Sequence, residues 1–204
     1  MSRHLIKILL IYFFIPTQGQ YQDSLIVDST ICCLIEWNDF KTKPLLEQSM
    51  IWKYMVMNCP HATKRTYIYG EKTYKNLILE EDNSERREGL IDTLLLNYDL
   101  RLEYFKDSAQ VFYRKAVAIL HYRKSEIKTA YYLLKEAIRI DPYVSDQYYI
   151  VFMIASNSML EMKEISVSEY TDNRKMSLVY LSEIKENNPY TDIQKTINYI
   201  EDHF

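Results

Sequence analysis

The chain has 204 residues, enough for one helical domain with a substantial core. Hydrophobic residues make up 48%, which excludes a disordered chain, and three glycines and five prolines are too few for a turn-rich all-β fold. The formal net charge is −3 and no basic stripe stands out, which argues against nucleic acid as a partner. Composition therefore predicts an all-α protein.

The first residues have the pattern of a secretory signal peptide. Arg3 and Lys7 precede an unbroken apolar run at 8–15, and small residues before Gly19 suit cleavage after that residue. We expect a signal peptide at 1–19 and one mature domain at 20–204. The apolar run is too short to span a bilayer, and no later segment reaches the required length, so no integral membrane segment is expected after cleavage. The alternatives are an uncleaved anchor and a buried N-terminal helix.

Apolar residues recur at helical spacing through most of the remaining chain. Gly70 stands in mid-helix and indicates a close approach between helices. Asn83 or Ser84 is expected to be an N-cap, and Ser125 another. The polar run 164–173 is expected to be a joint between helices. The predicted helices are a pair within 30–58, followed by 62–80, 89–105, 107–123, 125–142, 143–162, 174–188 and 191–204.

The stretch AYYLLKEAIRIDP at 130–142 has the clearest pattern. Ala130 and Ala137 lie two helical turns apart on one face, where a neighbouring helix can approach closely, and Pro142 ends the helix. This stretch resembles the second helix of a tetratricopeptide repeat, and 107–142 is the best single repeat. Aligning Pro60 with Pro142 matches Trp52 to Leu134. The resemblance implies an all-α, TPR-like solenoid of about eight or nine helices, stacked as antiparallel pairs.

The mature chain is also similar, more loosely, to signal-bearing tetratricopeptide-like proteins of Gram-negative, Bacteroidota-type envelopes. The segments that carry this likeness are Asn58-Cys59-Pro60, the following Tyr-rich helix with Gly70, and Leu90–Phe105. The resemblance implies an exported protein of the periplasm or cell envelope.

Three cysteines are present, and a disulfide is expected between Cys59 and one of two adjacent cysteines. The ends of an antiparallel hairpin are neighbours, so Cys33–Cys59 or Cys32–Cys59 is geometrically reasonable in an oxidising compartment. The alternative is three reduced, buried thiols. His61 is nearby but isolated, so no metal site is expected.

No catalytic motif is found. The four histidines are scattered, and the chain has no GxSxG, HExxH or P-loop pattern. We therefore expect neither an enzyme nor a cofactor.

The family's usual activity is to bind a partner segment in a groove lined by the first helix of each pair. The resemblance places this surface on the helix 107–123, and the alternative is that these residues only pack or solvate that helix. The expected function is a non-enzymatic protein–protein interaction scaffold or adaptor with an unidentified protein partner. The alternative is an obligate structural subunit of a larger envelope or secretion assembly, marked by apolar residues exposed on 148–162. The candidate partner-binding residues are Phe112, Lys115, Ile119, Tyr122 and Arg123.

Overall fold

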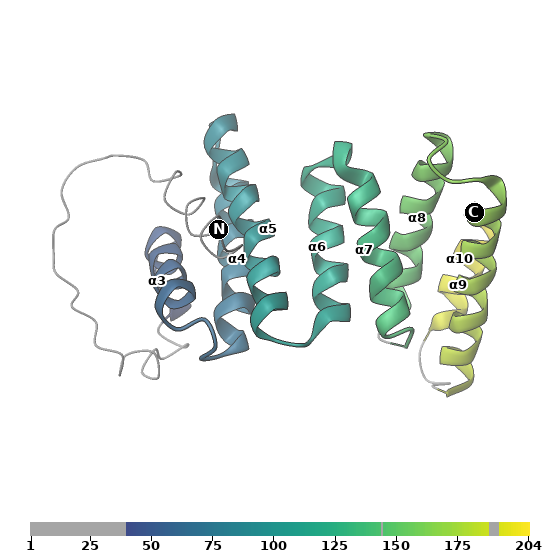
Figure 1. Cartoon of the computed structure of the whole chain (residues 1–204), viewed down its shortest axis with the longest axis horizontal. Coiled ribbons are helices and arrows are strands. Elements are labelled where there is room, and N and C mark those ends of the chain that lie inside the picture. Colours follow the sequence, from purple (N-terminus) through teal and green to yellow (C-terminus); the bar gives the residue numbers. More distant parts are fainter. Residues whose placement is uncertain (1–39, 144, 188–191) are drawn as a thin grey trace, which may run out of the picture.

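A computed structural model describes residues 40–143, 145–187 and 192–204. The predicted signal peptide at 1–19, its boundary with the mature domain, and Cys32 and Cys33 lie outside these residues. The helices succeed one another across the molecule in chain order, with α3 at one end and α9 and α10 at the other (Figure 1). They are α3 (Leu45–Asn58), α4 (Lys64–Glu80), α5 (Ser84–Tyr104), α6 (Ser108–Tyr122), the 3₁₀ turn η2 (Lys124–Glu126), α7 (Ile127–Ile140), α8 (Gln147–Glu161), α9 (Val167–Asn187) and α10 (Ile193–His203).

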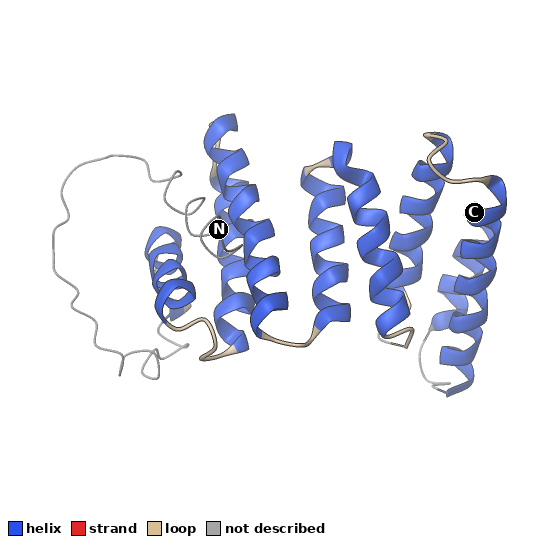
Figure 2. Cartoon of the chain, in the orientation of Figure 1, coloured by secondary structure: helices blue, strands red, loops and turns tan. Residues whose placement is uncertain are grey.

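Each helix packs against the next one along the chain. Within the described ranges every regular element is a helix (Figure 2), so the predicted all-α helical-repeat fold is confirmed. The predicted hairpin of the best repeat also forms, because α6 and α7 are antiparallel neighbours joined by η2. Ala116, Ala130 and Ala137 are fully buried in the shared core, as the close-approach argument required.

Alternate helices are also in contact, which divides the stack into two rows. In the row α4, α6, α8 and α10, one side-chain pair joins each helix to the next of the row. These pairs are Glu71–Arg114, Tyr113–Tyr148 and Asp146–Thr196. In the other row, α3, α5, α7 and α9, Trp52–Asn97 joins α3 to α5 and Tyr131–Asn173 joins α7 to α9. These contacts make the stack a two-layered array.

The half of the stack that begins with α3 and the half that begins with α7 share a hydrogen bond between a tyrosine hydroxyl and a proline carbonyl. The Tyr67 hydroxyl donates to the Pro60 carbonyl at 2.9 Å, and the Tyr149 hydroxyl donates to the Pro142 carbonyl at 2.7 Å. In each case a helix of the first row is fastened to the proline that ends the preceding helix. The alignment of Pro60 with Pro142 therefore holds beyond the prolines themselves. Two of the corresponding helix pairs also agree in length, since α3 and α7 have 14 residues each and α5 and α9 have 21 each, whereas α4 with 17 is longer than α8 with 15.

A buried asparagine of the third helix joins the two preceding helices in both halves. Asn97 accepts from the Trp52 indole at 2.8 Å and donates to the Tyr67 carbonyl at 2.9 Å. Asn173 donates to the Tyr131 hydroxyl and to the Ser156 hydroxyl. Because a buried polar group needs a partner, these asparagines fix the relative positions of three helices at once.

Gly70 makes the first of these junctions possible. A Cβ at this position would collide with the Trp52 indole and lie 2.6 Å from Oδ1 of Asn97. The close helix approach that the sequence indicated at Gly70 is therefore confirmed, and Trp52 and Asn97 are the side chains that need it.

The predicted polar joint at 164–173 is wrong over most of its length. Helix α9 begins at Val167, and the Ser166 hydroxyl accepts from the Glu169 amide at 3.1 Å. The segment is polar because most of its side chains face solvent. Asn173 is buried, and its side-chain amide donates a hydrogen bond to the Tyr131 hydroxyl. Polar composition therefore concealed the first two turns of a long helix.

Helix α6 begins at Ser108, one residue after its expected start. Helix α5 begins at Ser84, which fits an N-cap at 83 or 84 but lies five residues before the expected range 89–105. Asn83 caps α5, because its side chain accepts from the Arg86 amide at 2.9 Å. Asp107 precedes α6 without capping it, since its carboxylate is bound by Arg101. Ser125 lies inside η2, and α7 begins without a side-chain cap, so the predicted role of Ser125 as an N-cap is wrong.

Candidate interaction surface

The five residues predicted to bind a partner are largely engaged within the molecule. Ile119 is 1% exposed and belongs to the core. The Lys115 ammonium lies 2.6 Å from the Asp99 carboxylate of α5. The half-buried side chains of Phe112 and Tyr122 pack against opposite halves of the core.

Arg123 is fixed in the same way. Its guanidinium lies 2.6 Å from Asp92 and 3.0 Å from Glu88, both on α5, and 3.5 Å from Glu126. The structure therefore places Lys115 and Arg123 on the α5 side of α6 and buries Ile119, so these three do not form one exposed surface. The exposed side of α6 lies about 150° around the helix from the predicted residues, where Gln110, Arg114 and His121 face solvent.

A buried carboxylate connects the exposed side of α6 to α4. Glu71 is 5% exposed, and its Oε1 lies 2.7 Å from the Lys75 ammonium and 3.1 Å from the Arg114 guanidinium. Burial alone would raise the pKa of the Glu71 carboxyl, but the hydrogen bonds and charges of Lys75 and Arg114 outweigh burial and lower it. Glu71 is therefore ionised, and one negative charge holds two positive charges in place.

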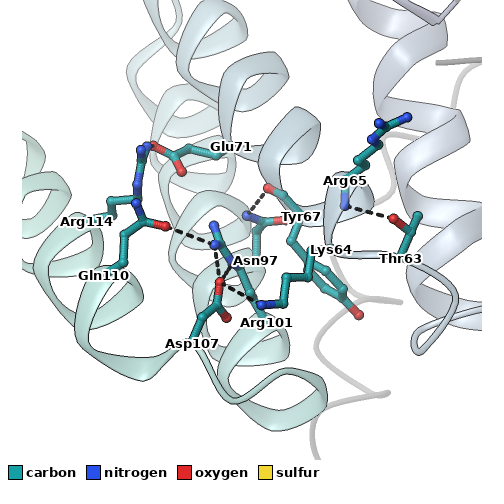
Figure 3. A network of polar contacts seen from close by, with 10 residues as sticks. All are labelled: Thr63, Lys64, Arg65, Tyr67, Glu71, Asn97, Arg101, Asp107, Gln110 and Arg114. Carbon is teal, nitrogen blue, oxygen red and sulfur yellow. Dashed lines mark hydrogen bonds and ion pairs between the residues drawn. The ribbon is translucent and has the colours of Figure 1, made fainter. Parts of the chain in front are cut away.

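A second ionic cluster lies at the start of α6 (Figure 3). The buried Arg101 guanidinium binds the Asp107 carboxylate and donates to Gln110 at 3.3 Å, and the Lys64 ammonium lies 3.7 Å from Asp107. Burial raises the pKa of the Asp107 carboxyl, but Arg101 first and then Lys64 more than compensate, so this pKa also lies below its usual value. Since Arg101 is 3% exposed, its ion pair with Asp107 fastens the α5–α6 connection, and Lys64 is the exposed cation of this cluster.

Helix α4 presents a stripe of basic and apolar side chains to solvent. The stripe consists of five exposed residues, Lys64, Arg65, Ile68, Lys72 and Leu79, and of the half-exposed Lys75. These six side chains lie within about 100° of the helix circumference. We name these six residues the α4 stripe; Arg114 of α6 lies beside it, linked through Glu71.

The expectation that the chain has no basic stripe is wrong for α4. Residues 40–79 contain seven Lys or Arg and two Glu, a formal charge of +5, whereas residues 80–204 contain 16 Lys or Arg and 22 Asp or Glu, a formal charge of −6. The net charge of the whole chain hides this asymmetry. A charge count by segment, combined with the helical wheel of 64–80, would have located the stripe.

Cys59 follows the last residue of α3 and is 6% exposed. It takes part in a disulfide. The cysteines to which it was predicted to bond, Cys32 and Cys33, lie outside the described residues, so the choice between them stays a prediction.

The described part of the chain contains no group of three or more His, Cys, Asp or Glu side chains positioned to hold a metal ion. None of its helices combines the length and the apolar character that crossing a bilayer requires.

No protein-family model matches the chain, and no curated protein is similar to it at a significant level.

Proposed function

We propose that this protein is a non-enzymatic interaction scaffold of the bacterial cell envelope, built on a tetratricopeptide-like stack. The observation that supports it most directly is the α4 stripe with Arg114, a surface on two neighbouring helices that is both basic and apolar. Interaction surfaces combine exposed apolar groups with charged groups that orient the partner. This surface replaces the predicted one on the opposite side of α6.

Export and an envelope location are part of the proposal. They are supported by the signal-like pattern at 1–19 and by the disulfide of Cys59, since disulfides persist in oxidising compartments.

Site-specific photo-crosslinking tests the scaffold function. A benzophenone amino acid is placed at Lys72 or at His121, both exposed on the first row, in cells that naturally produce the chain. We expect a discrete cross-linked product of defined mass from both positions. The matched control is Arg139 of α7, which is exposed and belongs to the second row. Absence of a product at both test positions, or the same products from Arg139, would contradict the proposal.

A second candidate is an obligate subunit of a larger assembly. Its predicted mark on 148–162 is largely missing, because most apolar side chains of α8 are buried. Exposed apolar side chains occur instead along one side of α3, where Leu46 is 70%, Met50 62% and Met57 46% exposed. At the aligned positions α7 has Lys128, Tyr132 and Arg139, two of which are charged.

Sedimentation of the purified full chain separates the two candidates. A monodisperse monomer that stays soluble supports the scaffold. Aggregation that is relieved by Leu46→Gln with Met50→Gln supports the obligate subunit, because these changes remove apolar surface without touching the core.

A further inference from the structure

Charge is distributed unevenly between the helices that the structure describes. The +5 of residues 40–79 opposes the −6 of residues 80–204. Part of the acidic excess lies on α5, which carries five Asp or Glu and three Lys or Arg. Its Glu88 and Asp92 pair with Arg123, which follows α6, and its Asp99 pairs with Lys115 of α6. On α4, Lys64 and Lys75 pair with Asp107 and Glu71, whereas Arg65 and Lys72 form no ion pair within the described residues.

The α4 stripe contains no carboxylate. The acidic residues of α4 are Glu71, which points into the stack at 5% exposure, and Glu80, which ends the helix. Lys72 forms no ion pair within the described residues. An exposed lysine between Ile68, 46% exposed, and Leu79, 70% exposed, therefore offers a positive charge flanked by apolar contact area.

Lys75 and Arg114 are held in place by Glu71. Their side chains are 37% and 43% exposed, so part of each cationic group faces solvent while the rest is bound to the shared carboxylate. A cation already held by a buried partner loses less conformational entropy when it binds a second anion. The cluster of one carboxylate and two cations has a net charge of +1 and is ready to accept another carboxylate.

We propose that the α4 stripe, together with Arg114, binds an acidic polypeptide segment of the partner. This inference rests on the proposed scaffold function and specifies the chemistry of its partner. Carboxylate side chains of the segment bind Lys72, Lys75 and Arg114, and its apolar side chains contact Ile68 and Leu79. Charge complementarity supplies orientation and a fast association rate, while the apolar contacts slow dissociation.

The same observations favour a polypeptide over a lipid surface. Interfacial helices bury a continuous apolar face in the bilayer. The two most exposed apolar residues of the stripe are eleven residues apart, about 16 Å along the helix, with lysines between them. The cations also come from two different helices, α4 and α6. Spaced apolar contacts with charges between them match the alternation of an acidic, amphipathic segment.

Fluorescence anisotropy with a defined probe tests the inference. The probe is an 18-residue labelled peptide in which glutamates and leucines alternate at helical spacing, and its control carries glutamine at every glutamate position. We expect the acidic peptide to bind the full chain at least about tenfold more tightly than the neutral one, with an affinity that falls several-fold from about 50 to about 200 mM salt. Equal affinity for the two peptides, or no binding of either, would overturn the inference.

Single substitutions on the α4 stripe locate the binding site. Lys72→Glu should weaken binding of the acidic peptide about tenfold, and Leu79→Asn should weaken it several-fold at both salt concentrations. The matched control is Lys175→Glu on α9, which changes the net charge equally at another exposed position. If Lys72→Glu and Lys175→Glu reduce affinity equally, the α4 stripe is not the site.

Competition with other polyanions tests whether the partner is a polypeptide. The competitors are anionic phosphatidylglycerol vesicles and a single-stranded oligonucleotide. If either binds more tightly than the peptide and loses affinity in Lys72→Glu, the stripe binds lipid or nucleic acid and the inference is overturned. Failure of the inference is distinguishable from failure of the scaffold function. Cross-linked products at Lys72 together with equal binding of acidic and neutral peptides would reject only the acidic chemistry of the partner.

Discussion

The Trp52 indole of α3 donates a hydrogen bond of 2.8 Å to Oδ1 of Asn97 of α5, directly across the backbone of Gly70 in α4. Three helices therefore meet at a point where only a glycine leaves room. Trp52 also makes an edge-to-face contact with Tyr74, whose ring centroid is 4.8 Å away. This junction positions α4, whose solvent-facing side carries the α4 stripe.

Gly70→Ala should destabilise the protein although alanine is the better helix former. Helix propensity favours the change by about 1 kcal/mol. The collision with Trp52 outweighs this gain, and overpacking of a tight core costs about 1–3 kcal/mol. Urea unfolding should show a net loss. Gly89→Ala, in a half-buried part of α5, is the control and should leave stability unchanged or raise it. A Gly70→Ala variant as stable as wild type would contradict the close packing.

Asn97→Leu should cost about 2–4 kcal/mol, because it leaves the Trp52 N–H and the Tyr67 carbonyl buried without their partner. Thermal unfolding of Asn97→Leu, Trp52→Phe and the double variant forms a cycle. We expect the double variant to lose less than the sum of the single losses, since the two residues share one hydrogen bond. Strict additivity would show that the bond contributes nothing to stability.

Tyr67→Phe and Tyr149→Phe should each lower stability by about 1 kcal/mol, since each removes one hydroxyl that donates to a proline carbonyl. The two sites are in different halves, so their effects should add. Tyr132→Phe, at an exposed ring, is the control and should have no measurable effect. A loss in one half without a loss in the other would show that the paired bonds are not equivalent.

The Glu71 cluster predicts a specific dependence of stability on pH. Burial raises the Glu71 pKa, but Lys75 and Arg114 bring it below the ordinary value of 4.5 in the folded state. Because the folded pKa is the lower one, the contribution of Glu71 is fully present well above 4.5 and is lost as pH falls through the folded pKa. Asp107, held by Arg101, has the same sign.

Glu71→Gln should therefore cost about 1–2 kcal/mol near neutral pH, and its difference from wild type should shrink on acidification to about pH 3. Denaturant unfolding at several pH values measures this difference. The control is Glu136→Gln, whose carboxylate pairs with Arg139 at the surface, where solvent screens the pair. A difference that grows on acidification would contradict the assigned sign.

The sequence alone determined the helical class, the antiparallel hairpin of 107–142 and the close approach at Gly70. These depend on local rules, because apolar spacing, proline and glycine constrain the backbone wherever they occur. Local rules also narrowed the N-cap of α5 to Asn83 or Ser84, and the structure shows that it is Asn83. The start of α9 was missed, because buried Asn173 reads as a loop residue until its hydrogen-bond partners on α7 and α8 are known.

Only the tertiary structure decided which side of α6 faces solvent. Lys115 and Arg123 have the composition of a binding site, yet their charges are satisfied by Asp99 and Asp92 of α5, and Ile119 is enclosed by the core. A helical wheel shows which residues share a face, but it does not show which neighbour will cover that face. Charge pairing between helices is a property of the assembled stack. For this reason only the structure shows that Lys115 and Arg123 are paired with α5 while Lys72 of α4 stays exposed.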